Sequence, residues 1–172
     1  MKKIVIIALT IIVCYLLQTC IFSHLSLANV TPNLLVIVTS SFGFMRGRKD
    51  GMFVGFFCGL LLDLSAGTYF GMYALIFLLI GYLNGLFSKL FYGDDIKLPI
   101  VLIAVSDLLY SFVVYIVLFL VKGKFDFLFY LRAVILPEVV YTMLVSIFLY
   151  LILYKLNLLI DKEDKRSHSR FV

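Results

Sequence analysis

The chain has 172 residues, of which 63% are hydrophobic and only 15% are charged, and its formal net charge is +5. Soluble domains contain about 45–50% apolar and about 25% charged residues, so this chain has too few polar side chains to cover a surface that faces water. The composition therefore excludes an ordinary soluble protein and predicts an integral membrane protein.

The first apolar segment runs from Ile4 to Phe22, directly after Lys2 and Lys3. It resembles the start of a secretory signal peptide, but the apolar part of such peptides has only about 7–15 residues and a cleavage site of small residues follows it closely. This segment is longer, with 19 residues, and no such site follows it. We therefore expect a retained membrane helix.

Six apolar segments are candidates for membrane spans. At a rise of about 1.5 Å per residue the second is only about 21 Å long, whereas the hydrocarbon core of a bilayer is about 30 Å thick. The second and third, both short, need shielding by neighbouring helices or a thinner bilayer, and a re-entrant pair is an alternative. We predict one transmembrane domain over residues 1–155 and a polar cytoplasmic tail over residues 156–172. The spans are 4–22, 32–45, 51–66, 70–91, 98–121 and 133–154.

The three prolines stand near the starts of segments, where the missing N–H of proline is not needed. Thr31 precedes Pro32 and is a candidate N-cap for the second segment. Pro137 is a candidate start for the last helix, and the aromatic-rich stretch 124–132 then leads into it along the membrane surface.

The basic residues predict the orientation. With six spans and a cytoplasmic N-terminus, twelve of them fall on the cytoplasmic side and three on the outer side, as the positive-inside rule requires. Both termini are therefore expected on the cytoplasmic side of the membrane, and the net charge needs no nucleic acid partner. The cytoplasmic set includes a short basic loop, with Arg46, Arg48 and Lys49.

Glycines recur at every fourth position in the third segment. Residues four apart lie on one face of a helix, and small residues at that spacing let a second helix approach closely. This pattern predicts a seam for helix packing or for docking of a partner, and packing between helices of the same chain is the simpler reading. The series is Gly51, Gly55, Gly59, Asp63, Gly67 and Gly71, with a second pair at Gly81 and Gly85.

Three carboxyl groups fall inside the apolar segments, where charge is costly and usually has a function. Asp63 can accept hydrogen bonds from the backbone of the turn 65–70 or from an incoming polar group. Asp107 has Ser106, Tyr110 and Ser111 as nearby donors, and Glu138 follows Pro137 at a helix start, where the helix dipole favours it. We interpret the three as polar contacts that hold helices together, with a proton relay as the alternative.

Catalytic and metal-binding patterns are missing from the sequence. It has no H-E-x-x-H, G-x-S-x-G or P-loop motif, and its three cysteines and two histidines lack the spacing of metal ligands. We therefore predict neither an enzyme nor a cofactor.

Several stretches resemble one family. They are TPNLLVIV (31–38), RGRKDGMFVGFFCGLLLDLSAGTYFGMYAL (46–75), GYLNGL (81–86) and LPEVVYTML (136–144). Together they are similar to the bacterial rod-shape-determining membrane protein MreD, with departures at Asn33, where an acidic residue is common, and at Thr142, where asparagine is common.

The resemblance implies more than spacing does. Its members are non-enzymatic parts of the elongation machinery that inserts peptidoglycan into the side wall, together with the single-span protein MreC, the MreB filament and a glycosyltransferase/transpeptidase pair. The implied fold is an all-α, six-helix bundle similar to the substrate-binding subunits of energy-coupling-factor transporters. A vitamin or small-molecule transporter subunit is thus the alternative function, although those subunits resemble one another in an alanine pair, and here Ala8 is followed by Ile12 four residues later.

Overall fold

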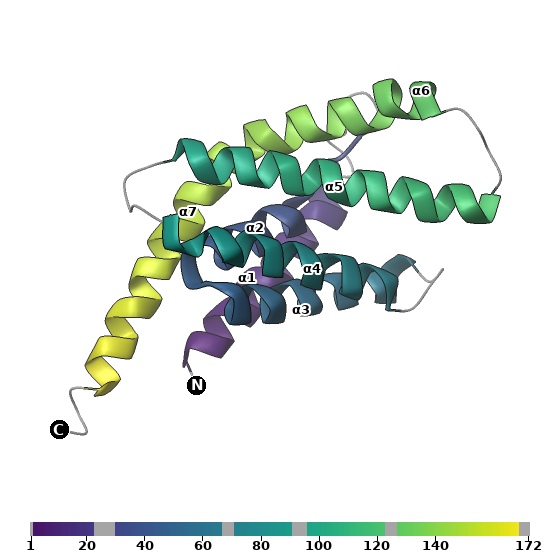
Figure 1. Ribbon diagram of the computed structural model, residues 1–172. Coiled ribbons are helices and arrows are strands. Elements are labelled where there is room, and N and C mark those ends of the chain that lie inside the picture. Colours follow the sequence, from purple (N-terminus) through teal and green to yellow (C-terminus); the bar gives the residue numbers. More distant parts are fainter. Residues whose placement is uncertain (1, 23–29, 67–70, 91–95, 123–126, 169–172) are drawn as a thin grey trace.

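The computed structural model describes residues 2–22, 30–66, 71–90, 96–122 and 127–168, and every element within them is helical (Figure 1). The long elements are α1 (Lys2–Leu16), α2 (Leu34–Arg46), α3 (Arg48–Ala66), α4 (Met72–Leu86), α5 (Lys97–Lys122) and α7 (Leu136–His168). Shorter ones extend three of them: the π-helix η1 (Leu17–Ile21), the 3-10 helix η2 (Phe87–Leu90), and α6 (Phe127–Tyr130) with the π-helix η3 (Leu131–Ile135).

Four helical stretches among the described residues are long and apolar enough to cross a membrane: Lys3–Ile21, Met72–Lys89, Lys97–Val117 and Leu128–Asp161. The expected all-α membrane protein is therefore confirmed. Of the other two predicted spans, α2 is apolar but short, and α3 carries Arg48, Lys49, Asp50 and Asp63 along its 19 residues.

Helix α2 lies at the centre of the molecule. Every residue from Leu34 to Phe44 is buried, and the helix contacts α1, α3, α4, α5 and α7. A helix of 13 residues is only about 20 Å long. Because its neighbours enclose it, α2 does not need to match the thickness of the bilayer.

The N-cap of α2 is Asn33, whose side-chain oxygen accepts a hydrogen bond from the N–H of Val36 at 3.3 Å. The prediction of Thr31 for this role was wrong. Asparagine is as good a cap as threonine, and here the helix begins two residues later than Pro32 suggests.

The helices α3 and α4 run side by side as a hairpin, and α5 packs along the stretch formed by α6, η3 and the first part of α7 (Figure 1). The chain is helical without a break from Phe127 to His168, so Pro137 does not start the last helix. The wider turn of η3, in which the Leu136 N–H bonds to the Leu131 carbonyl, lies directly before the proline and accommodates it.

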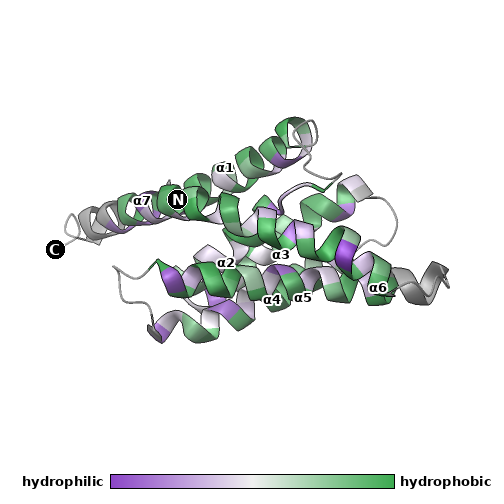
Figure 2. Cartoon of the chain, turned by 90° about the horizontal axis from the view of Figure 1, so that it is seen from above, coloured by the Kyte–Doolittle hydropathy of each residue, from purple (hydrophilic) through white to green (hydrophobic). Residues whose placement is uncertain are grey.

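Hydrophobic residues occur along all the long helices (Figure 2), and many of their side chains are exposed. Examples are Ile4 on α1, Phe53 on α3, Val101 on α5 and Phe148 on α7, the last with 75% of its surface accessible. In water such a surface would drive aggregation, whereas in a bilayer it faces lipid.

Candidate functional site

The glycines of the third segment face the hairpin partner. A Cβ atom added to Gly51 would lie 2.5 Å from the carbonyl oxygen of Gly81, and one added to Gly55 would collide with the carbonyl oxygen of Phe77. At Gly59 it would collide with the backbone of Tyr73 and Ala74, and at Gly85 it would lie 2.5 Å from Cα of Arg48. The two backbones thus touch along the whole hairpin, and we call this contact the glycine seam: Gly51, Gly55, Gly59, Gly81 and Gly85.

Helix α2 adds a glycine that the spacing pattern does not reveal. A Cβ on Gly43 would lie 2.8 Å from the Gly81 carbonyl oxygen, and one on Gly51 would lie 2.7 Å from Cα of Gly43. Three helices therefore meet at this point. Because α2 and α4 fill the glycine seam, a helix of another protein has no access to it in this conformation.

The last two glycines of the predicted series do not extend the seam in the described part of the chain. Gly67 lies outside the described residues. Gly71 has φ +96° and a Cβ there would meet no atom within 4 Å. Its role is to adopt a left-handed conformation directly before α4, which residues with a side chain rarely do.

Asp63 caps the first turn of α4. Its two carboxyl oxygens accept hydrogen bonds from the backbone N–H groups of Tyr73 and Ala74, both at 3.0 Å, and its side chain is buried. The first N–H groups of a helix have no partner within the helix, and the positive end of the helix dipole favours a carboxylate. Among the described residues the donors are thus in the first turn of α4, whereas most of the turn 65–70 expected from the sequence, residues 67–70, lies outside them.

A second polar contact joins α4 to α2 and α5. The amide nitrogen of Asn84 donates to the hydroxyl of Ser106 at 2.7 Å and lies 3.4 Å from the hydroxyl of Ser40. All three side chains are buried. Asn84 was not predicted as a contact residue, although it stands between Gly81 and Gly85 in an otherwise apolar segment.

Arg46 is the centre of an ionic cluster at one end of the bundle. Its guanidinium donates to Asn157 and Asp161 of α7, both at 2.7 Å, and lies 3.6 Å from Asp50 of α3. Asp50 also pairs with Lys3 of α1 at 2.6 Å. Four helices, α1, α2, α3 and α7, are thereby held together at this end.

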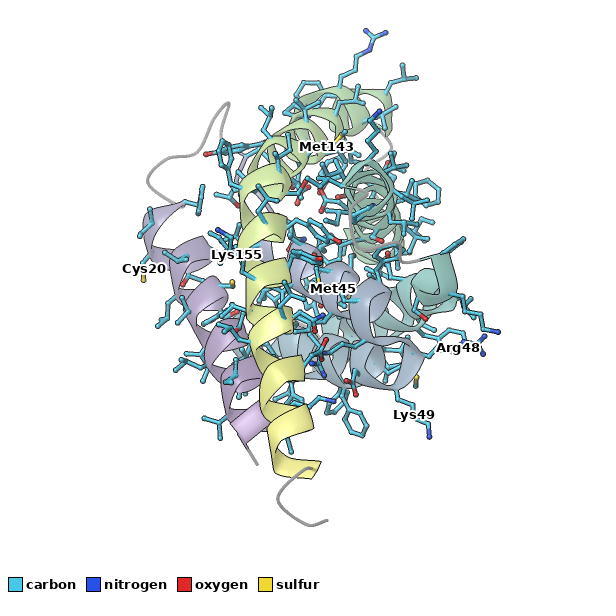
Figure 3. The ribbon with its side chains drawn as sticks, turned by 90° about the vertical axis from the view of Figure 1, so that its left-hand side faces the viewer. Cys20, Met45, Arg48, Lys49, Met143 and Lys155 are labelled. Atoms are coloured by element: carbon cyan, nitrogen blue, oxygen red, sulfur yellow. The ribbon has the colours of Figure 1, made fainter. Side chains whose placement is uncertain are left out.

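The other members of the predicted basic loop have a different role. Arg48 and Lys49 are exposed and point away from the bundle (Figure 3). The Arg48 guanidinium lies 5.9 Å from the centre of the Tyr82 ring, a cation–π distance. Arg46 alone turns inward, and the sequence does not separate it from its neighbours.

The other two carboxyl groups predicted inside the membrane, Asp107 and Glu138, lie on α5 and α7. Asp107 is completely buried, and neither of its oxygens has a hydrogen bond with any described residue. Of the donors expected from the sequence, Ser111 donates to Glu138 at 3.1 Å, whereas Ser106 accepts a hydrogen bond from Asn84. Glu138 therefore contacts α5, and the unbroken helix before Pro137 leaves it no free helix end to cap.

The two positions that depart from the family pattern contact each other. The backbone N–H of Asn33 donates to the hydroxyl of Thr142 at 3.2 Å, which joins the start of α2 to α7. Thr142 lies one turn beyond Glu138 on the same face of α7 and next to the Asp107 carboxyl. The departures thus occur together, at one contact between two helices.

These contacts define a helical membrane protein whose buried polar groups join its own helices. The described residues contain no cluster of three side chains suited to a metal ion. The family model "rod shape-determining protein MreD" matches residues 1–159, so the chain belongs to the MreD family, as its motifs predict. No curated protein and no solved structure matches the chain, and the expected likeness to transporter subunits stays a prediction.

Proposed function

We propose that this protein is a non-enzymatic scaffold of the cell-elongation machinery in the bacterial cytoplasmic membrane. In this role it supports side-wall peptidoglycan synthesis by holding an MreC-like single-span protein, and through it the MreB-like filament and the wall synthases. The observation that carries the proposal is the family match over residues 1–159, because that family determines rod shape. The absence of a catalytic motif in the sequence agrees with it.

The partner binds to the outer, lipid-facing surface. The glycine seam is occupied by α2 and α4, whereas α1 and α3 each expose large apolar side chains over their length, among them Leu9, Phe53 and Phe57. Helices associate in lipid through such surfaces by van der Waals packing.

Both termini lie in the cytoplasm. The twelve-to-three distribution of basic residues supports this orientation. The ionic cluster supports it as well, because Lys3, near the N-terminus, and Asp161, late in α7, belong to the same end of the bundle as Arg46.

The test is replacement of the native MreD in a rod-shaped host by this chain, followed by purification in mild detergent. We expect normal cell width and recovery of the MreC-like protein. A photocrosslinker at Leu9, Phe53, Val101 or Phe148, which are exposed on four different helices, then identifies the face that binds it. Round cells despite normal membrane levels, or recovery of a transporter ATPase in place of MreC, would overturn the proposal.

A further inference from the structure

The contact between α5 and α7 contains two acidic side chains and no base. Asp107 lies about 15 Å along α5 from Lys97, well inside the membrane. Ser111, one turn after Asp107 on α5, donates a hydrogen bond to the Glu138 carboxyl group of α7 at 3.1 Å, which places the two acidic side chains in the same part of the contact. Neither group has a salt bridge with a described residue. The ion pairs among the described residues all belong to the cluster around Arg46 and Asp50.

Among the described residues, the groups that face Asp107 offer it no positive charge, since Arg132 of η3, an element that also packs against α5, is exposed. Its own helix contributes Tyr110, which in turn lies near Tyr73 of α4 and Tyr130 of α6, and all three phenol groups are neutral at physiological pH. Helix α2 contributes only uncharged side chains above Arg46, and α7 contributes Glu138 and the hydroxyl of Thr142. A carboxylate buried among these groups would have the Thr142 hydroxyl as a hydrogen-bond donor but no counter-ion among the described residues, which costs several kcal/mol or more.

We propose that Asp107 and Glu138 form a proton-binding site between α5 and α7. With a proton bound, Asp107 is neutral and gains an O–H donor, for which the Thr142 hydroxyl and the Glu138 carboxylate are acceptors on α7. The proton thus neutralises a buried charge and adds a hydrogen-bond donor between the two helices. Its loss leaves two negative charges facing each other, and α7 is pushed away from α5.

Thr142 links this site to the start of α2. Its hydroxyl oxygen accepts the hydrogen bond from the N–H of Asn33 while its own hydrogen is free to turn toward Asp107. Separation of α5 from α7 would therefore also disturb the start of α2.

The test is infrared spectroscopy of the purified protein in lipid nanodiscs, where a protonated carboxyl group has a C=O band separate from that of a carboxylate. We expect wild type to show this band at neutral pH and Asp107→Asn to lack it. In Glu138→Gln the band should disappear at a lower pH than in wild type, because a neighbouring negative charge no longer helps to retain the proton. Ser65→Ala, on an exposed part of α3, is the control and should match wild type.

A second measurement follows the helices and does not depend on the variants. Spin labels at Leu108 on α5 and Val140 on α7, both exposed, should move apart in wild type as the pH rises and the band disappears. The proposal is wrong if wild type shows no protonated carboxyl band at neutral pH, or if the label distance stays constant while the band disappears. It is also wrong if Na⁺ or K⁺ displaces the band at constant pH, since the site then binds a cation.

Discussion

Two charged side chains in this protein, those of Asp63 and Arg46, form hydrogen bonds to buried groups that would otherwise have no partner. The carboxylate of Asp63 satisfies two N–H groups at the start of α4, a helix whose own N-cap is a glycine and offers no side chain. Arg46 satisfies three partners on two other helices with one planar group. In both cases a costly charge inside the bundle is offset by donors or acceptors that would otherwise be unpaired.

Asparagine at position 63 should be partly tolerated. Asp63→Asn keeps the size of the side chain but only one acceptor oxygen, so one of the two backbone hydrogen bonds is lost. We expect a loss of about 1 kcal/mol in the free energy of unfolding, typical of a weakened cap, and a clearly larger loss for Asp63→Leu. The chain has no tryptophan, so SDS titrations followed by circular dichroism are suitable. Equal losses for both variants would mean that the charge itself is needed.

Lysine cannot replace Arg46. A guanidinium reaches Asn157, Asp161 and Asp50 together from fixed positions, whereas an ammonium group is a single point of charge. Arg46→Lys should lower the free energy of unfolding by about 1.5–3 kcal/mol, the contribution of a charged hydrogen bond. The matched control is Arg48→Lys on the exposed side, for which we expect a change within about 0.5 kcal/mol. Similar values for the two variants would contradict the role given to the ionic cluster.

At the scale of the helix, close approach between backbones fixes the hairpin α3–α4. The glycine seam has no room for even a methyl group, because carbonyl oxygens of α4 occupy the places where Cβ atoms of α3 would be. Helices that touch in this way gain van der Waals contact over their length, which is the main attraction between helices in lipid.

One methyl group should therefore separate the hairpin. Gly55→Ala places its Cβ against the Phe77 carbonyl, and the rigid backbone there cannot turn aside. The expected cost is about 1–3 kcal/mol, as for other overpacked sites. Ser65→Thr adds one methyl at an exposed position of the same helix and should have little effect. Measurement is again by SDS titration, and a stable Gly55→Ala protein would show that the helices separate at little cost.

At the scale of the whole molecule, the topology proposed above places the end of the bundle that holds the ionic cluster in the cytoplasm. In a chain without its natural cysteines, Ser26→Cys and Lys124→Cys should react with a membrane-impermeant maleimide added outside intact cells. Arg48→Cys and His168→Cys should react only after the membrane is opened. Reaction of Arg48→Cys from outside would contradict the topology.

The sequence predicted an all-α membrane protein, its family and a glycine face suited to helix packing, because composition and periodicity are properties of single segments. It did not predict which groups would meet. Asp63 bonds to α4, Asp107 has no hydrogen bond with a described residue and Arg46 turns inward, and all three outcomes depend on how the helices are placed relative to one another. The last helix is longer than predicted at both ends. The wider turn of η3 lets the helix continue through Pro137, and the polar composition after residue 155 does not prevent α7 from continuing to His168.

The enclosure of α2 has a consequence for how the chain is made. Asn33 and Arg46 find their partners on α7 more than 100 residues later, at separations of 109 and 111 residues. At a synthesis rate of about 5–20 residues per second, α2 leaves the ribosome about 5–20 s before α7 is available. During that interval Arg46 has Asp50 of α3 within reach but neither of its α7 partners. A chain that stops short of Asn157 never gains these partners, and its ionic cluster then holds α1, α2 and α3 together without α7.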